Sequence, residues 1–158
     1  MTEDELMMKM ALEEAKIAAH AGEVPVGCVI VRNGEVIVRT HNAVEATLQG
    51  TAHAELLAIQ EASRILGMWR LDDCTLYVTK EPCAMCAGAM VNCRVPRLVF
   101  GCGDPKYGAA GGCVNVCNLP QALQKIQITS GVLEEECSQI LREFFRNRRI
   151  QTEGNGKR

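Results

Sequence analysis

Two short segments of the chain carry residues that could bind a metal ion and move a proton. Residues 51–55 read Thr-Ala-His-Ala-Glu, and residues 81–86 read Glu-Pro-Cys-Ala-Met-Cys. One imidazole (His53) and two thiolates (Cys83 and Cys86) form a ligand set that suits tetrahedral zinc with one position left open. A water in that position loses its proton near neutral pH, so the pattern predicts a hydrolytic zinc centre.

Glu55 stands two residues after the predicted imidazole ligand, a spacing that does not place both side chains on one face of a regular helix. A carboxylate beside the ion could take a proton from the bound water and deliver it to a nitrogen of the substrate. The combined pattern H-x-E…P-C-x-x-C is the signature of zinc deaminases. Glu55 is therefore the predicted catalytic residue.

Other interpretations of the two cysteines lead to different classes of protein. A Cys-x-x-Cys pair after a strand could be a thioredoxin-like redox pair, which would form a disulfide and bind no stoichiometric metal. A structural zinc site would need a fourth Cys or His, and no other cysteine has paired spacing with these ligands. Neither interpretation accounts for the His-x-Glu segment upstream, so we favour a catalytic centre with one Zn²⁺ per chain.

The composition is typical of a globular enzyme. The 158 residues are 47% hydrophobic and 23% charged, and this length favours one domain. No apolar stretch approaches the ~20 residues that span a bilayer, and the acidic N-terminus lacks the features of a secretion signal. The odd number of cysteines, nine, argues against a secreted disulfide scaffold. We expect a cytoplasmic enzyme without an organic cofactor.

The charges of the chain are unevenly placed, although the net charge of −2 does not indicate general nucleic-acid binding. From residue 141 onward six basic residues oppose two acidic ones, so this segment carries +4 and the remainder −6. Two explanations stay open on charge alone: contact with phosphates, or arginines that complement a helix dipole. The basic residues are Arg142, Arg146, Arg148, Arg149, Lys157 and Arg158.

Hydrophobic periodicity and turn residues predict helices and strands that place both chemical segments at helix N-termini. Asn33-Gly34 predicts a hairpin, and Thr51 and Pro82 are expected near the starts of the helices that carry the ligands. The expected strands are 24–31, 36–40, 75–79, 97–100 and 126–129, and the expected helices are 3–21, 52–66, 83–92 and 134–149, with loops at 42–50 and 101–112. A hairpin followed by alternating strands and helices predicts a mixed sheet with helices on both faces.

Over nearly the whole chain the sequence resembles the cytidine deaminase-like superfamily and, within it, the bacterial tRNA-specific adenosine deaminases. The resemblance rests on the two segments above and extends from residues 23–27, through 76–79, 81–90 and 100–106, to 144–146. It implies a three-layer α/β/α sandwich with a five-stranded mixed sheet, and a homodimer. It also implies a single zinc-dependent nucleoside deaminase domain over residues 1–158, with a basic C-terminal helix and tail at about 134–158.

The resemblance further implies the reaction and the residues that carry it. Adenosine at the wobble position of a tRNA anticodon would be hydrolysed to inosine with release of ammonia. His53, Cys83 and Cys86 match the zinc ligands of the family, and Glu55 matches its proton carrier. An anticodon stem-loop is a suitable partner because its unstacked bases reach a buried site at low cost.

The same resemblance implies where the RNA is contacted. Asn42 matches a residue that contacts the target nucleoside, Asp104 and Lys106 match residues that contact flanking nucleotides, and Phe145 and Arg149 match residues near the anticodon loop. The nearest alternative is a deaminase of a free base or nucleotide, such as guanine, cytosine or dCMP, with the same zinc site. The loop at 104–106 and the arginines after 144 favour an RNA substrate, because an enzyme that acts on a small molecule needs no positively charged C-terminal segment.

Overall fold

The computed structural model describes residues 1–154, with side chains as far as Thr152. The helices and strands in these residues alternate after an opening hairpin. In chain order they are α1 (Glu3–His20), β1 (Gly27–Arg32), β2 (Glu35–His41), α2 (Val44–Thr47), α3 (Ala54–Leu66), β3 (Cys74–Lys80), α4 (Ala84–Asn92), β4 (Arg97–Cys102), β5 (Gln127–Thr129) and α5 (Glu134–Gly154). Lys157 and Arg158, the last two basic residues of the predicted tail, lie outside the described residues.

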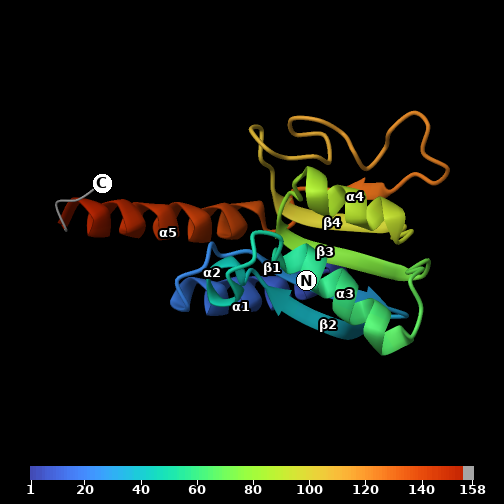
Figure 1. Cartoon of the computed structure of the whole chain (residues 1–158), viewed down its shortest axis with the longest axis horizontal. Coiled ribbons are helices and arrows are strands. Elements are labelled where there is room, and N and C mark those ends of the chain that lie inside the picture. The colour runs from blue at the N-terminus through green and yellow to red at the C-terminus, as the bar shows by residue number, and fades with distance from the viewer. Residues whose placement is uncertain (155–158) are drawn as a thin grey trace.

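The strands form one sheet in the order β2-β1-β3-β4-β5 (Figure 1). β1 pairs antiparallel with β2 and with β3, whereas β3, β4 and β5 run parallel. A parallel pair needs a crossover connection, and α4 supplies the one between β3 and β4. The five-stranded mixed sheet expected from the sequence is confirmed.

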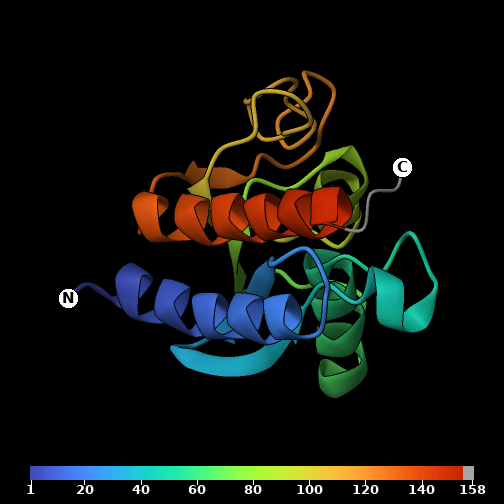
Figure 2. The ribbon, with the colours of Figure 1, turned by 90° about the vertical axis from the view of Figure 1, so that its left-hand side faces the viewer.

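Helices cover both faces of this sheet, with α1 and α5 side by side on one face (Figure 2) and α3 and α4 on the other. Successive residues of a strand point to opposite faces. Leu76 and Val78 of β3 accordingly join the core under α3 and α4, whereas Tyr77 joins the core under α1 and α5. This arrangement is the expected three-layer α/β/α sandwich.

The hairpin turn and the start of β1 depend on residues that have special backbone or space requirements. Asn33 and Gly34 both have positive φ, 52° and 78°, as the predicted hairpin turn requires. Gly27 allows α1 to pack directly on β1, because a Cβ atom at Gly27 would collide with the carbonyl oxygen of Ala11.

The helices that carry the predicted ligands begin later than the sequence suggests. Thr51 does not cap α3: its carbonyl accepts from the N–H of His53 at 2.8 Å, and the helix begins at Ala54. His53 is the N-cap residue instead, with an extended backbone, and Cys83 has the same place before α4. Neither side chain makes a capping hydrogen bond to its helix, so the imidazole and the thiol stay available as ligands.

Several other boundaries differ from the expectation by one or two residues, among them β4, which continues to Cys102 into the expected loop at 101–112, and three differences are larger. The first strand begins at Gly27 rather than at residue 24, because the N–H of Val26 closes a tight turn onto the carbonyl of Val24 around Pro25. The expected loop at 42–50 contains the short helix α2. The last helix continues to Gly154, five residues beyond its expected end.

In the part of the chain that the structure describes, no helix is long and apolar enough to span a membrane.

Candidate active site and metal centre

The three predicted metal ligands meet where α3 and α4 begin. Nδ1 of His53 lies 3.6 Å from Sγ of Cys83 and 3.6 Å from Sγ of Cys86. The three ligand atoms all lie within 4.8 Å of one another, and no other group of His, Cys, Asp or Glu in the described residues is arranged to share an ion. Helix ends with unpaired N–H groups favour the thiolate form of nearby cysteines.

These distances fit a tetrahedral zinc ion. Zn–N bonds of about 2.05 Å and Zn–S bonds of about 2.3 Å, at tetrahedral angles, place nitrogen and sulfur about 3.6 Å apart. Nδ1 is the ring atom of His53 that faces both sulfurs, so it is the atom that would bind the ion. Three protein ligands leave one coordination position for a non-protein group.

Hydrogen bonds among the two sulfurs and the imidazole shift the pKa of each of the three groups. Hydrogen bonds from Cys86 and then from His53 lower the pKa of Cys83 to about 3. The hydrogen bond to Cys83, followed by burial, raises the pKa of Cys86, and a hydrogen bond to Cys83 raises the pKa of His53. The shift favours the thiolate form of Cys83, and a bound cation would displace the protons of Cys86 and of Nδ1 of His53.

Glu55 lies in the first turn of α3 and is only 4% exposed. Burial is the main cause that raises the pKa of its carboxyl group to about 7, while its own backbone N–H, His53 and Lys80 oppose that rise. A carboxyl group that titrates near neutrality can take up and release a proton in turn. Glu55 is thus chemically suited to the acid–base role that the sequence predicts.

His53, Glu55 and Cys83 line a cavity of about 420 Å³, a volume within the range of small-molecule sites. Its walls come from distant parts of the chain: the segment before and within α2, the loop after β4, and the exposed helix α5. The wall residues with a polar or aromatic side chain include Glu23, Asn42, Lys80, Asp104, Tyr107, Phe145 and Arg148.

A buried carboxylate that the sequence analysis did not single out holds the α2 wall. Glu23 is 2% exposed, and its carboxylate accepts hydrogen bonds from the N–H groups of Glu45 and Ala46 at 2.9 and 2.7 Å. It satisfies donors at the start of α2 that would otherwise lack a partner. No local pattern marks this contact, because 22 residues separate Glu23 from Glu45.

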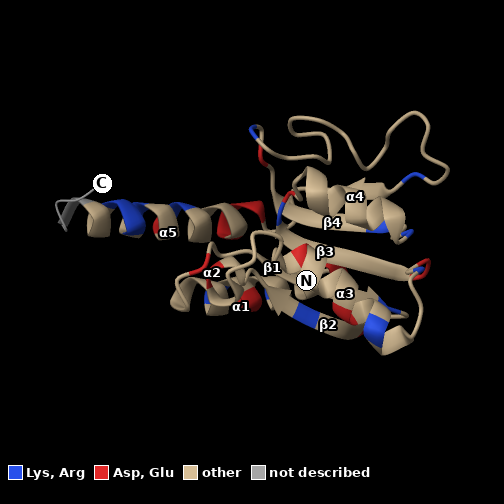
Figure 3. Ribbon diagram, viewed as in Figure 1, with Lys and Arg blue, Asp and Glu red and all other residues tan. Residues whose placement is uncertain are grey.

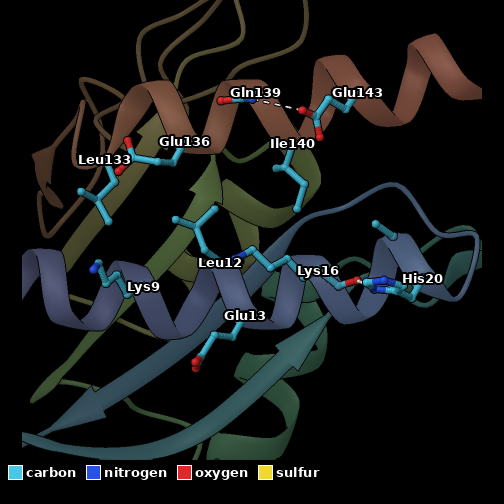
Figure 4. A pocket seen from close by; sticks show the side chains of 11 residues that line it. Lys9, Leu12, Glu13, Lys16, His20, Leu133, Glu136, Gln139, Ile140 and Glu143 are labelled. Carbon is cyan, nitrogen blue, oxygen red and sulfur yellow. Dashed lines mark hydrogen bonds between the residues drawn. The ribbon is translucent and has the colours of Figure 1, made fainter.

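A larger groove, of about 620 Å³, lies between α1 and α5 on the opposite face of the sheet (Figure 4). Leu12 of α1 faces Leu133 and Ile140 across it, and lysines and glutamates surround them. None of the predicted ligands or substrate residues lines this groove. The cavity lined by predicted ligands and by Glu55 is the smaller one at the starts of α3 and α4.

Comparison with known proteins places the chain in a family. The MafB19-like deaminase family matches residues 2–149. The tRNA-specific adenosine deaminase of Bacillus subtilis (strain 168) is 52% identical over 149 residues, which cover 94% of this chain and 92% of that protein. The chain belongs to this deaminase family.

Solved structures agree with that assignment. A structure from work on A-to-I editing by tRNA:A34 deaminases superposes on this chain with a TM-score of 0.83. The two are 41% identical, and the match covers 86% of this chain and 99% of the other. The guanine deaminase of Nitrosomonas europaea is more distant, with a TM-score of 0.77 and 25% identity over 89% of this chain and 83% of the other. The fold is therefore shared by deaminases that act on different purines.

The structure brings three of the five predicted substrate residues of the deaminase to the cavity. Asn42, Asp104 and Phe145 line it, whereas Lys106 and Arg149 do not. Asn42 is 8% exposed and is held by backbone groups: its Nδ2 donates to the carbonyl of Val24, and its Oδ1 accepts from the N–H of Val44.

The neighbours of the other two predicted residues reach the cavity in their place. Tyr107 lines it, and the Lys106 ammonium lies over the Tyr107 ring, 5.4 Å from its centroid. Arg148 lines it, whereas Arg149 lines an adjacent groove together with Phe145. Adjacent residues on a helix point about 100° apart. The sequence motif alone therefore does not show which of Arg148 and Arg149 faces the cavity.

The Asp104 carboxylate of the deaminase interacts with other groups of the same chain. Oδ1 accepts from the N–H groups of Lys106 and Tyr107 at 2.9 and 3.0 Å, and Oδ2 lies 3.1 Å from Nζ of Lys80. Burial opposes ionisation, but the hydrogen bonds from Tyr107, Lys80 and Lys106 hold the pKa of Asp104 below its ordinary value. Asp104 thus shapes its own loop.

Proposed function

We propose that this protein hydrolyses adenosine to inosine at the wobble position of a tRNA anticodon. In the net reaction water replaces the amino group at C6 of adenine, and ammonia leaves. The observation that carries the proposal is the grouping of His53, Cys83 and Cys86 at a cavity that Glu55 also lines. Identity of 52% to a tRNA-specific adenosine deaminase supports the choice of substrate.

We assign His53, Cys83 and Cys86 as the ligands of one Zn²⁺ per chain. When bound, the ion supplies a Lewis acid that brings the pKa of a water molecule close to neutrality. Beside that site, the Glu55 carboxylate is placed to accept a proton from water and to deliver a proton to the amino nitrogen that leaves C6 of adenine. Glu55 itself is 4% exposed, which limits the access of bulk water to its carboxylate.

Asn42 is suited to orient the nucleoside. Two hydrogen bonds to backbone groups hold its side-chain amide, and each polar atom keeps capacity for one further bond. An amide held in this way offers a donor and an acceptor in fixed positions. Asn42 therefore positions the substrate relative to Glu55 without a change of rotamer.

The outer part of α5 is the surface that we assign to the anticodon stem-loop. The helix begins with three acidic residues, projects from the body, and carries its arginines further out (Figure 3). Its last turn, as far as the structure describes it, holds no basic residue, so the arginines do not complement the helix dipole there. Phe145 and Arg148 connect this surface to the cavity, and Arg149 extends it along the helix.

We further infer a homodimer that acts in the cytoplasm, as the family resemblance implies. A tRNA substrate is consistent with that location. Sedimentation of the purified protein at several concentrations tests the dimer, with the mass of a single 17.2-kDa chain as the contrary result.

A deamination assay with purified, zinc-loaded protein tests the proposed function. The substrates are an anticodon stem-loop with a wobble adenosine, its cytidine counterpart, and free adenosine, cytidine and guanine. Inosine formed only in the adenosine stem-loop is the expected result. Ammonia released only from a free base or nucleoside would retain the zinc chemistry and overturn the assignment to tRNA; a disulfide between Cys83 and Cys86 without stoichiometric zinc would instead favour a redox protein.

A further inference from the structure

A third buried carboxylate, that of Glu81, binds the backbone of the loop that follows β4. Glu81 stands directly before Pro82 and Cys83 and is 4% exposed. Its Oε1 accepts from the N–H of Asp104 at 2.8 Å, and its Oε2 accepts from the N–H groups of Ala110 and Gly112 at 3.0 and 2.8 Å. Three backbone donors of one loop thus converge on one side chain, and each would lose its partner without it.

The loop is shaped around this carboxylate. A Cβ atom at Gly112 would collide with Oε1 of Glu81, and a Cβ atom at Gly108 would collide with its carboxyl carbon. Neither glycine has a φ in the left-handed region, so space rather than backbone conformation excludes a side chain at both positions. The close fit indicates that the loop has one preferred arrangement around Glu81.

The loop held by Glu81 carries two residues of the cavity wall. Asp104 is held twice, because its backbone N–H bonds to Glu81 while its carboxylate pairs with Lys80 at 3.1 Å. Tyr107, which lines the cavity but is 65% exposed, stands three residues further along. The predicted zinc ligands and Glu55 belong to the starts of α3 and α4 instead, so this loop forms the rim and not the reacting centre.

We propose that Glu81 is a positioning residue that fixes the rim of the substrate cavity and thereby sets the affinity for an adenosine embedded in RNA. This inference rests on the proposed function, since it assigns the rim to the nucleotides that flank the target base. A loosened rim weakens binding of a stem-loop, because the flanking nucleotides then have no preformed surface. It changes the chemical step much less, because Glu55 and the ligands keep their places.

Steady-state kinetics of Glu81→Gln and Gly112→Ala test the proposal. In Glu81→Gln, an amide nitrogen replaces one acceptor and faces an N–H donor, so at least one of the three bonds is lost. In Gly112→Ala, the new methyl group pushes the loop away from an intact Glu81. Gly88→Ala is the matched control, because a Cβ atom at Gly88 in α4 meets nothing within 4 Å.

For both test variants we expect KM for the stem-loop to rise by about tenfold to 100-fold. We expect kcat to stay within about threefold and zinc to remain stoichiometric. Hydrogen exchange at the backbone N–H groups of Asp104, Ala110 and Gly112 should accelerate. Gly88→Ala should leave all of these quantities unchanged.

Two results would overturn the proposal. One is an unchanged KM with unchanged hydrogen exchange in the loop. The other is a lower kcat or a loss of zinc at constant KM, which would mean that Glu81 acts through the neighbouring Cys83. If Glu81→Gln does not fold, Gly112→Ala decides alone. If the wild-type protein does not deaminate the stem-loop, the proposed function fails, whereas hydrogen exchange still decides whether Glu81 holds the loop.

Discussion

Nδ1 of His53 and Sγ of Cys83 lie 3.6 Å apart although 30 residues separate them in the chain. Each residue is the extended N-cap of its own helix, so the starts of α3 and α4 meet at one point. Two helix N-termini directed at the same place create a positive potential that favours thiolates. The meeting of the predicted metal ligands is therefore a consequence of how α3 and α4 pack together on one face of the sheet.

Cys83→Ala should lower bound zinc well below one ion per chain and abolish deamination, because two protein ligands hold zinc much less tightly than three. Metal analysis together with the stem-loop assay checks this expectation. Cys113→Ala is the control, since Cys113 is exposed and is not one of the predicted ligands. Chelation of the wild-type protein should lower its Tm, and added zinc should restore it, because a ligand of the native state stabilises that state. Full activity in metal-free protein would refute the zinc assignment.

Glu55→Ala should keep the fold and the zinc but lower turnover by ~10²-fold or more, the usual cost of a lost acid–base group. Single-turnover kinetics with the stem-loop and metal analysis of the same sample measure both quantities. Glu61→Ala serves for comparison because Glu61 lies on the same helix and pairs with Arg64. Unreduced turnover in Glu55→Ala would remove this residue from the mechanism.

Arg149→Ala should weaken tRNA binding and reduce the slope of log affinity against log salt by about one, as expected for one lost phosphate contact. Arg148→Ala should also raise KM, because Arg148 lines the cavity and lies over the Phe144 ring. Binding titrations at four salt concentrations measure the slope. Arg64→Ala, on the exposed end of α3, should leave it unchanged. An unaltered slope for Arg149→Ala would argue against a phosphate contact there.

Asp4 connects the start of α1 to the sheet, and its contribution to stability should depend on pH. Hydrogen bonds from Arg97 and Tyr77 lower the pKa of Asp4 in the folded protein although burial opposes them. A lowered folded-state pKa stabilises the fold above the ordinary pKa near 3.8 and loses that effect as pH falls through the folded value.

Asp4→Asn should therefore lower the free energy of unfolding by about 1–2 kcal/mol at pH 7. The difference from wild type should shrink as pH falls below about 4. Urea unfolding at pH 7, 5 and 3.5 measures it. Asp72→Asn, which removes an exposed pair with Arg70, should have little effect at any of these pH values. A difference for Asp4→Asn that does not vary with pH would refute the ionic explanation.

The sequence by itself determined the chemistry and the order of the elements. His53, Glu55, Cys83 and Cys86 stand in two short segments whose residue types and spacing are enough to predict a hydrolytic metal centre. The hairpin at Asn33-Gly34 was equally predictable, because positive φ at two adjacent residues is a local requirement. Such features depend on neighbours within a few residues, which a sequence displays directly.

The tertiary structure alone decided what surrounds the centre. Glu81 meets Gly112 across 31 residues, and Glu23 meets Ala46 across 23, so no local pattern could connect them. On α5, the structure separates Arg148, which lines the cavity, from Arg149, which does not. These outcomes depend on how loops close and how a helix is rotated on the sheet. Many weak long-range contacts set both properties together, and no single residue type encodes them.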